Sequence, residues 1–403
     1  MKEWKLSPLD TFCLGMTIKG AWIYSELPSA KQLYTSLEQT LRQYPHLLGH
    51  YDEKSKAVLW SGNESCIELL ELDLRDHNSA EDMYSLVPKY DINGFKSGKT
   101  PALQAYLLRL KDSSALVLQG AHALMDGVSF YSLVREWGKR TMGEQTEPMK
   151  TDQSLIPDPD SLSEKQTLAA VQQRGWCKIG FKSLIKMMFN MAASSRIKDT
   201  FTLTLPWEEI EKMKKESGAG TNAVLCNYAI GQLIAKLGKE DPYTLIQVAD
   251  LRGRACEVGE NFMGNFSQAL NIGSFQSTDG AAEIDAKARK LLEHKEFLTE
   301  QVQLSVSASH HSLPYYYFNA CEMNTPKPSL IYINNQLKLR ACEIEFGTGA
   351  PLRAQQAMLP DMIKFWQSQA GGPVEIIYSG FAARTMAKAK GNSITGTTPK
   401  AKD

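Results

Sequence analysis

The hydrophobic positions in the first part of the chain alternate between strand-like and helix-like spacing. Three apolar runs have the length expected for strands: residues 13–24, 100–110 and 114–122. The last two are separated by only "KDSS", which predicts a hairpin. Residues 29–45 predict a helix that begins with a capping box of Ser29 and Gln32 and ends at a proline. A second helix is expected at 129–138, directly after the strand that ends in "GAH".

The same alternation returns after residue 199. A strand followed by a helix is predicted within residues 201–218. A long helix is predicted at residues 282–302. The remaining elements are a helix at 222–238, with Gly238 as its cap, and strands at 244–250, 329–335 and 374–380. Because both parts mix strands with long helices, the pattern predicts an α/β protein of two similar units.

Four segments follow from this pattern. Residues 1–142 form the N-terminal unit, and residues 199–385 form the C-terminal unit. Residues 143–198 are expected to link them, since they begin with a polar, proline-containing stretch and continue into a helix at 181–194. The polar tail, 386–403, is expected to be disordered.

Composition narrows the classes of partner. Lysine plus arginine and aspartate plus glutamate are each 45, so the net charge is zero, which argues against nucleic acid as the main partner. The seven cysteines are scattered without metal-ligand spacing, which favours reduced thiols in the cytoplasm and no metal site. No apolar run is long enough for a membrane span, and no apolar signal core follows the first residues.

Three methionines lie on the predicted helix 181–194. Met187, Met188 and Met191 are expected to pack against the core or another unit. The wall of a ligand tunnel is the alternative, because methionine adapts to varied apolar partners.

The most specific chemical signal is "GAHALMDGVSF" at 120–130. It places His122 in the loop between a predicted strand and a predicted helix, with Asp126 and Gly127 four and five residues later. Loops on a rigid scaffold often carry catalytic side chains. A histidine here is either a structural residue at a turn or a general base, since histidine accepts and returns protons near neutral pH.

Further motifs occur in a characteristic order around this H-x-x-x-D-G sequence. They are "LSPLD" at 6–10, "LRQYPHLLGHY" at 41–51, "DLRGR" at 250–254, "NFMGNF" at 261–266 and "EFGTGAP" at 345–351. Together with His122, the set resembles the BAHD acyltransferases, in the coenzyme A-dependent superfamily that includes chloramphenicol acetyltransferase and condensation domains. The resemblance covers residues 5–380. It implies two chloramphenicol acetyltransferase-like subdomains, each a mixed β-sheet with flanking helices, and an active-site channel between them.

The resemblance assigns roles to the residues of the motif. It implies that His122 is the general base, that Asp126 forms a salt bridge with an arginine and shapes the loop, and that Gly127 leaves room for substrate. It also implies a structural role for the "EFGTG" stretch, where Glu345 and Thr348 replace the family's aspartate and tryptophan. The residues given that structural role are Arg252, Arg254, Glu345, Phe346, Gly347 and Gly349. Glu345 is expected to pair with one of the two arginines.

Two further pairs of residues are candidates for binding reactants. Asn334 and Asn335 stand where family members carry polar residues of the active site, and an amide there could hold an oxyanion. A turn at the end of the strand explains the same asparagines. Thr221 and Asn222 begin a helix whose free amides could contact the cofactor, although simple N-capping also explains these residues. The segment 309–319, "SHHSLPYYYFN", is expected to be a loop whose tyrosines are candidates for lining an acceptor pocket.

The resemblance therefore implies an enzyme of secondary metabolism that moves an acyl group from acyl-coenzyme A to a small alcohol or amine. Acyl-coenzyme A is a co-substrate in this scheme, and no cofactor stays bound. Such enzymes are generally cytoplasmic monomers. Two alternatives remain open: a transferase that takes its acyl group from a carrier protein, and a binding protein that has kept the fold without catalysis.

Overall fold

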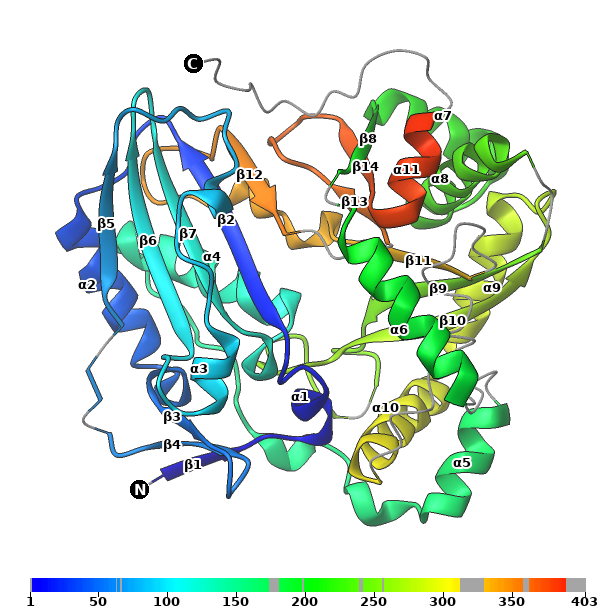
Figure 1. Cartoon of the computed structure of the whole chain (residues 1–403), viewed down its shortest axis with the longest axis horizontal. Helices are drawn as coiled ribbons and strands as arrows, with labels where there is room; N and C mark the ends of the chain where they lie inside the picture. The colour runs from blue at the N-terminus through cyan, green and yellow to red at the C-terminus, as the bar shows by residue number, and fades with distance from the viewer. Residues whose placement is uncertain are drawn as a thin grey trace.

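Two β-sheets with helices packed against them make up most of the molecule (Figure 1). The computed structural model describes residues 2–62, 64–65, 67–173, 181–197, 199–238, 242–255, 257–311, 330–357 and 362–388. The N-terminal sheet has the strand order β12-β2-β7-β6-β5, and the C-terminal sheet has the order β10-β9-β11-β13-β14-β8. Both sheets are mixed, because β5 pairs parallel with β6 and β11 pairs parallel with β9 and β13.

The N-terminal sheet is built on the predicted hairpin. Its strands are β2 (Thr17–Tyr24), β5 (Leu69–Leu74), β6 (Leu103–Leu110) and β7 (Ser114–Ala121). Every residue of β7 is buried, as expected for a central strand that is covered on both faces. Two helices cover one face: α2 (Ala30–Leu41) and α4 (Gly127–Thr141). Their leucines and aromatics share one core with Trp22, which makes the strand end at His122 a rigid support.

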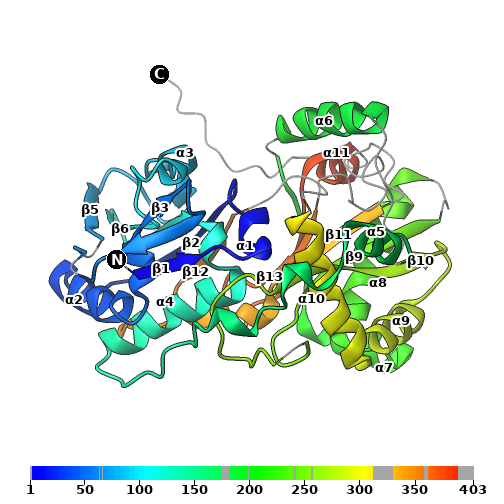
Figure 2. The same cartoon turned by 90° about the horizontal axis from the view of Figure 1, so that it is seen from below.

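Smaller elements surround this sheet. They are β1 (Lys2–Lys5), α1 (Pro8–Phe12), β3 (His50–Asp52), β4 (Ala57–Trp60) and α3 (Ile92–Lys96). Strands β1, β4 and β3 form a separate small sheet. Helix α1 lies between the two large sheets in Figure 2 and contacts α10 of the C-terminal half.

The C-terminal sheet packs its core face against several helices. Its strands are β8 (Phe201–Leu205), β9 (Tyr243–Asp250), β10 (Ser267–Phe275), β11 (Leu330–Asn335), β13 (Ile363–Trp366) and β14 (Val374–Tyr378). The helices are α7 (Trp207–Ser217), α8 (Thr221–Leu237), α9 (Ala281–Glu293), α10 (Lys295–His310) and α11 (Gly380–Lys388). Side chains alternate along each strand. Ile331 and Ile333 of β11 therefore point into this core, while Tyr332 and Asn334 lie on the opposite face.

One strand crosses from the C-terminal half to the N-terminal sheet. β12 (Arg353–Gln356) pairs antiparallel with β2, so the orange strand lies beside the blue one in Figure 1. The segment before it is held by Trp22 and Tyr24, whose side chains donate hydrogen bonds to the Ala341 and Ile344 carbonyls at 3.1 and 2.8 Å. This exchange of a strand joins the two halves through backbone pairing.

Several predicted elements have different limits in the structure. The helix expected at 282–302 is two helices, α9 and α10, because the chain leaves helical geometry at His294. His310 ends α10 and does not lie in a loop, while the tyrosines of "SHHSLPYYYFN" lie outside the described residues. Residues 386–388 of the predicted tail belong to α11, and the rest of that tail lies outside the described residues.

The linker contains two helices, α5 (Glu164–Gln173) and α6 (Phe181–Ser195). Met188 is expected to pack against the core or another unit, but its side chain is 61% exposed. The prediction fails at this position because Met188 lies on an exposed face of α6 with Phe181, Ile185 and Phe189. The side chains of Met187 and Met191 lie outside the described residues. None of the described helices is long and apolar enough to cross a membrane.

Candidate active site

His122 lies at the point where β7 leaves the sheet. Its backbone N–H donates to the Met16 carbonyl at 3.0 Å, so the start of the loop stays bonded to the neighbouring chain segment. The side chain is half-buried, whereas the next two residues, Ala123 and Leu124, are fully buried in the short 3-10 helix. The imidazole is therefore fixed at its base and retains an accessible edge.

Asn265 of the C-terminal half determines which ring nitrogen of His122 carries the proton. Its Oδ1 lies 3.1 Å from His122 Nδ1, and its Nδ2 donates to Asp10 Oδ1 at 2.8 Å and to the Ala123 carbonyl at 3.2 Å. Because both amide protons are used, the amide oxygen faces the imidazole and accepts the Nδ1 proton. The Nε2 atom then carries the lone pair that a general base needs.

Asp10 completes this chain of hydrogen bonds from α1. It is buried, and its Oδ2 accepts from the Ser7 N–H at 3.0 Å and the Ser7 hydroxyl at 2.8 Å. Burial raises the pKa of Asp10 to about 6, although hydrogen bonds from Asn265 and Ser7 oppose this rise. The motifs "LSPLD" and "NFMGNF" do not by themselves show that Asp10 and Asn265 meet. The structure brings Asp10 and Asn265 into one network with His122.

Asp126 and Arg252 form a buried ion pair behind the histidine. The Asp126 Oδ2 atom lies 2.9 Å from Arg252 Nη1, and its Oδ1 atom lies 3.0 Å from Nη2. Oδ2 also accepts from the backbone N–H groups of Phe266 and Ser267 at 3.0 and 2.8 Å. Burial acts to raise the pKa of Asp126, but the charge of Arg252 and hydrogen bonds from Arg252, the Ser129 N–H and the Ser267 hydroxyl lower it overall. Asp126 is thus an ionised carboxylate that holds the Asn265 loop in place.

Gly127 begins α4 and faces the C-terminal half. A Cβ atom added there would lie 3.6 Å from Leu339 Cδ1, which is an ordinary van der Waals distance. The fold alone therefore does not require glycine at this position. The interpretation that Gly127 leaves room for a substrate stays a prediction.

The pairing expected between Glu345 and an arginine does not form. Glu345 is exposed, while Arg252 is fully buried and contacts Asp126 and Asp250, both at 2.9 Å. No ion pair joins Glu345 to Arg252 or Arg254 in the part of the chain that the structure describes, and Arg254 is itself exposed. The acid cannot reach the pair, because it lies beside Gly138 near the C-terminal end of α4, whereas Asp126 caps the N-terminal end of the same helix, about three turns away.

The "EFGTG" stretch packs against the N-terminal half. Phe346 is fully buried with its ring edge-on to Trp137 at 4.9 Å, and a Cβ atom added at Gly138 would clash with the Glu345 carbonyl oxygen. The Thr348 hydroxyl, which stands where the family has tryptophan, donates to the Glu26 carbonyl at 2.7 Å. Gly347 and Gly349 both have φ of 93°, a conformation that favours glycine.

The structure separates the two asparagines at the end of β11. Asn335 faces α8, where its Nδ2 donates to Asn222 Oδ1 at 2.8 Å and its Oδ1 accepts from the Leu337 N–H at 3.1 Å. Asn334 points to the opposite face, with Tyr332. The predicted cofactor residue Asn222 is thus joined to Asn335, next to Thr221 in the first turn of α8. Asn335 thus uses its amide within the C-terminal half, while Asn334 lies on the face of β11 that carries Tyr332.

Tyr332 lies on this face of β11, and Cys13 caps the C-terminal end of α1. Burial, with a smaller effect of the Cys13 thiol, raises the pKa of Tyr332 to about 12. Burial, Asp10 and Asp126 likewise raise the pKa of Cys13 to about 12, so this thiol stays protonated and is a poor nucleophile. No group of three potential metal ligands occurs within the described ranges.

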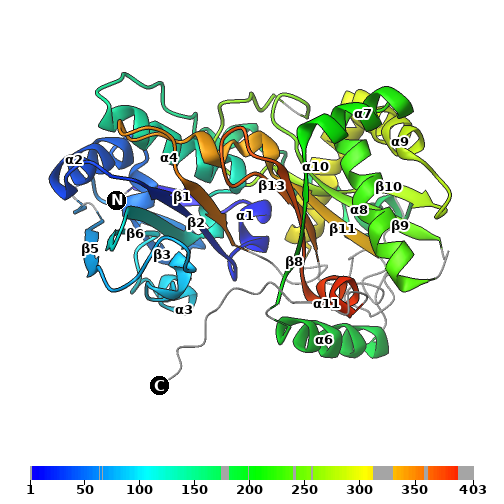
Figure 3. The same cartoon turned by 90° about the horizontal axis from the view of Figure 1, so that it is seen from above.

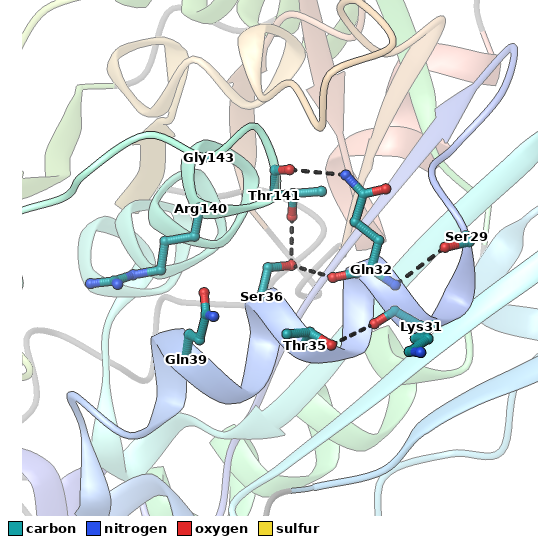
Figure 4. A pocket seen from close by; sticks show the side chains of 9 residues that line it. All are labelled: Ser29, Lys31, Gln32, Thr35, Ser36, Gln39, Arg140, Thr141 and Gly143. Atoms are coloured by element: carbon teal, nitrogen blue, oxygen red, sulfur yellow. Dashed lines mark hydrogen bonds between the residues drawn. The ribbon is translucent and has the colours of Figure 1, made fainter.

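A separate surface pocket between α2 and α4 does not belong to this site (Figure 4). Its polar groups are largely bonded to one another: Ser36 Oγ lies 2.7 Å from Thr141 Oγ1, and Gln32 Nε2 donates to the Thr141 carbonyl at 3.1 Å. These hydrogen bonds hold α2 and α4 together, which explains the polar side chains that line the pocket.

The raised pKa of Asp10 predicts a pH dependence of stability. Between the usual aspartate value of 3.8 and about 6, the folded protein binds a proton that the unfolded chain does not. The free energy of unfolding should therefore fall as pH rises from about 4 to about 6, by at most about 3 kcal/mol. Above about pH 6, Asp10 should cause no further change. Denaturant unfolding of the wild type and Asp10→Asn at several pH values isolates the effect. Parallel curves for the two proteins would contradict the prediction.

Comparison with solved structures agrees with this architecture. No family model and no curated protein matches the chain. TRI101 of F. graminearum, solved with coenzyme A and T-2 mycotoxin, is 13% identical, with 97% of this chain and 98% of that chain covered and a TM-score of 0.73. Vinorine synthase is 16% identical, with 96% and 92% covered and a TM-score of 0.64. The first condensation domain of the CDA synthetase is 11% identical, with 96% and 97% covered and a TM-score of 0.55. The chain therefore has, over nearly its whole length, the two-subdomain fold of these proteins, and the predicted fold is confirmed.

Proposed function

We propose that the chain is an acyltransferase that moves an acyl group from acyl-coenzyme A to a small alcohol or amine acceptor. The observation that carries the proposal is the hydrogen-bond chain from Asp10 through Asn265 to His122, which leaves Nε2 as a base. The shared fold supports it, because TRI101 was solved with coenzyme A and with small-molecule mycotoxins. Acyl-coenzyme A acts here as a co-substrate that leaves after each turnover.

The reaction proceeds within one ternary complex. The acceptor hydroxyl or amine attacks the thioester carbonyl carbon, a carbon–oxygen or carbon–nitrogen bond forms, and His122 Nε2 takes the proton. The carbon–sulfur bond then breaks, and the same proton passes to the sulfur, so that coenzyme A leaves as a thiol. Asn334 is our candidate for holding the oxyanion, and Thr221 and Asn222 are our candidates for contacts with the cofactor. Asp126 and Arg252 keep the loop in shape without moving a proton.

Thiol release tests this proposal. The purified protein is offered short-, medium- and long-chain acyl-coenzyme A with a panel of alcohols and amines, and free thiol is measured over time. We expect release that depends on both donor and acceptor. A panel of acylated carrier proteins is assayed beside it, because the condensation domain shares the fold. If acyl groups are transferred only from carrier proteins, the donor is an acylated carrier protein and not acyl-coenzyme A.

The same scheme also predicts that the protein is a monomer and is located in the cytoplasm.

Removing the amide of Asn265 should lower turnover without lowering affinity for coenzyme A. In Asn265→Ala, the Nδ1 proton of His122 loses its acceptor, so the imidazole adopts other tautomers and orientations. We expect kcat to fall roughly ten- to hundredfold. Asn261→Ala is the matched control, because Asn261 lies in the same "NFMGNF" segment and donates only to the exposed Pro148 carbonyl. Equal kcat values for the two variants would mean that Asn265 does not position the base.

A further inference from the structure

Helix α6 presents an apolar stripe to solvent. Phe181, Ile185, Met188 and Phe189 are 76%, 38%, 61% and 73% exposed. Their spacing places them on one face of the helix. Among the described residues, the other large hydrophobic side chains with high exposure are scattered over separate elements: Phe12, Met16, Leu70, Met142 and Leu352. A continuous exposed stripe of this kind marks an interaction surface.

The position of α6 leaves this stripe accessible. In Figures 2 and 3 the helix lies at the outer edge of the molecule, with α11 on its inner side. α6 contacts α11. The four apolar side chains are exposed despite this neighbour, so α11 does not cover the stripe.

The charge around α6 indicates what the stripe contacts. Residues 165–198 contain seven lysines and arginines and no aspartate or glutamate, although the whole chain is neutral. The seven are Lys165, Arg174, Lys178, Lys182, Lys186, Arg196 and Lys198. Of these, Lys182 and Arg196 are exposed at the two ends of α6. A helix with large apolar residues on one face and only basic charges is typical of segments that lie in an anionic lipid surface.

We propose that α6 docks the protein on an anionic membrane surface, with the stripe of Phe181, Ile185, Met188 and Phe189 inserted at the boundary of headgroups and acyl chains. A helix of 15 residues is too short to span a bilayer and would lie in the plane of the surface. The exposed Lys182 and Arg196 at the two ends of α6 supply the electrostatic attraction. This surface is distinct from the His122 site, so the inference does not depend on the proposed function.

Flotation with lipid vesicles tests the proposal on the full chain. We expect the wild type to float with vesicles of phosphatidylcholine and phosphatidylserine, less with phosphatidylcholine alone, and less at high salt. The double variant Phe181→Ser/Phe189→Ser should lower the partition coefficient by about tenfold or more. Leu70→Ser is the matched control, because Leu70 is 42% exposed on β5, outside α6. Circular dichroism and size exclusion check that each variant is folded.

Each outcome decides the proposal. Absence of flotation with the anionic vesicles, or equal flotation of the wild type and the double variant, would overturn it. A dimer that forms without vesicles and is abolished by the double variant would assign the stripe to a second copy of the chain instead. If the double variant does not fold, Lys182→Gln/Arg196→Gln replaces it, and a salt-sensitive loss of flotation is then the expected result.

Discussion

Replacing His122 by alanine should lower turnover by about 10²–10⁴-fold, the range that general-base assistance contributes. The acceptor would then have to lose its proton to water, while the contacts that bind coenzyme A would remain. The loss is therefore expected in kcat, with the affinity for coenzyme A changed little. Single-turnover thiol release and direct titration of coenzyme A measure the two effects separately.

His50→Ala is the matched control for this experiment. His50 is an exposed histidine on β3, outside the hydrogen-bond network of His122, Asn265 and Asp10, so its removal should leave thiol release unchanged. Retention of more than about a tenth of wild-type turnover by His122→Ala would be incompatible with a general base at this position. That result would place the proton acceptor elsewhere in the site, whereas a wild type that releases no thiol would favour a binding protein that has kept the fold.

Replacing Arg252 by alanine should have the largest effect on stability. Asp126 is 2% exposed, so the substitution leaves its charge buried without its partner. Breaking a buried pair in this way costs about 3–5 kcal/mol. Denaturant unfolding measures this loss. Turnover should fall as well, because Asp126 also holds the Phe266 and Ser267 amides that follow Asn265.

Arg254→Ala provides the comparison for Arg252. Arg254 lies in the same "DLRGR" segment but is exposed, so its removal should change the free energy of unfolding by no more than about 0.5 kcal/mol. Similar losses for the two variants would mean that the ion pair does not support the loop.

The sequence predicted the local elements well where the hydrophobic pattern is long and regular. The hairpin of β6 and β7, the helix that follows His122 and the alternating strands of the C-terminal half all occur as expected. The single helix predicted at 282–302 was wrong, since Glu293 and Lys295 are both good helix formers and nothing in their spacing marks the break at His294.

The parts that sequence patterns missed depend on contacts between distant segments. The transfer of β12 to the N-terminal sheet is set by pairing with β2, more than 300 residues earlier in the chain, so no local pattern carries it. Asn265 and Asp10 are likewise ordinary polar residues until the fold brings them together with His122. For Glu345 the motif led to a wrong prediction. Its place in "EFGTGAP" suggested an ion pair with an arginine, but Glu345 is exposed and Arg252 pairs with Asp126 instead.

Titration of the wild-type protein with coenzyme A by calorimetry tests the central claim most directly, because it requires no knowledge of the acceptor. We predict saturable binding with a dissociation constant in the micromolar range, weakened by added salt because the phosphates are charged. The His122→Ala variant should bind coenzyme A as the wild type does. No detectable binding to the wild type would contradict transfer from free acyl-coenzyme A.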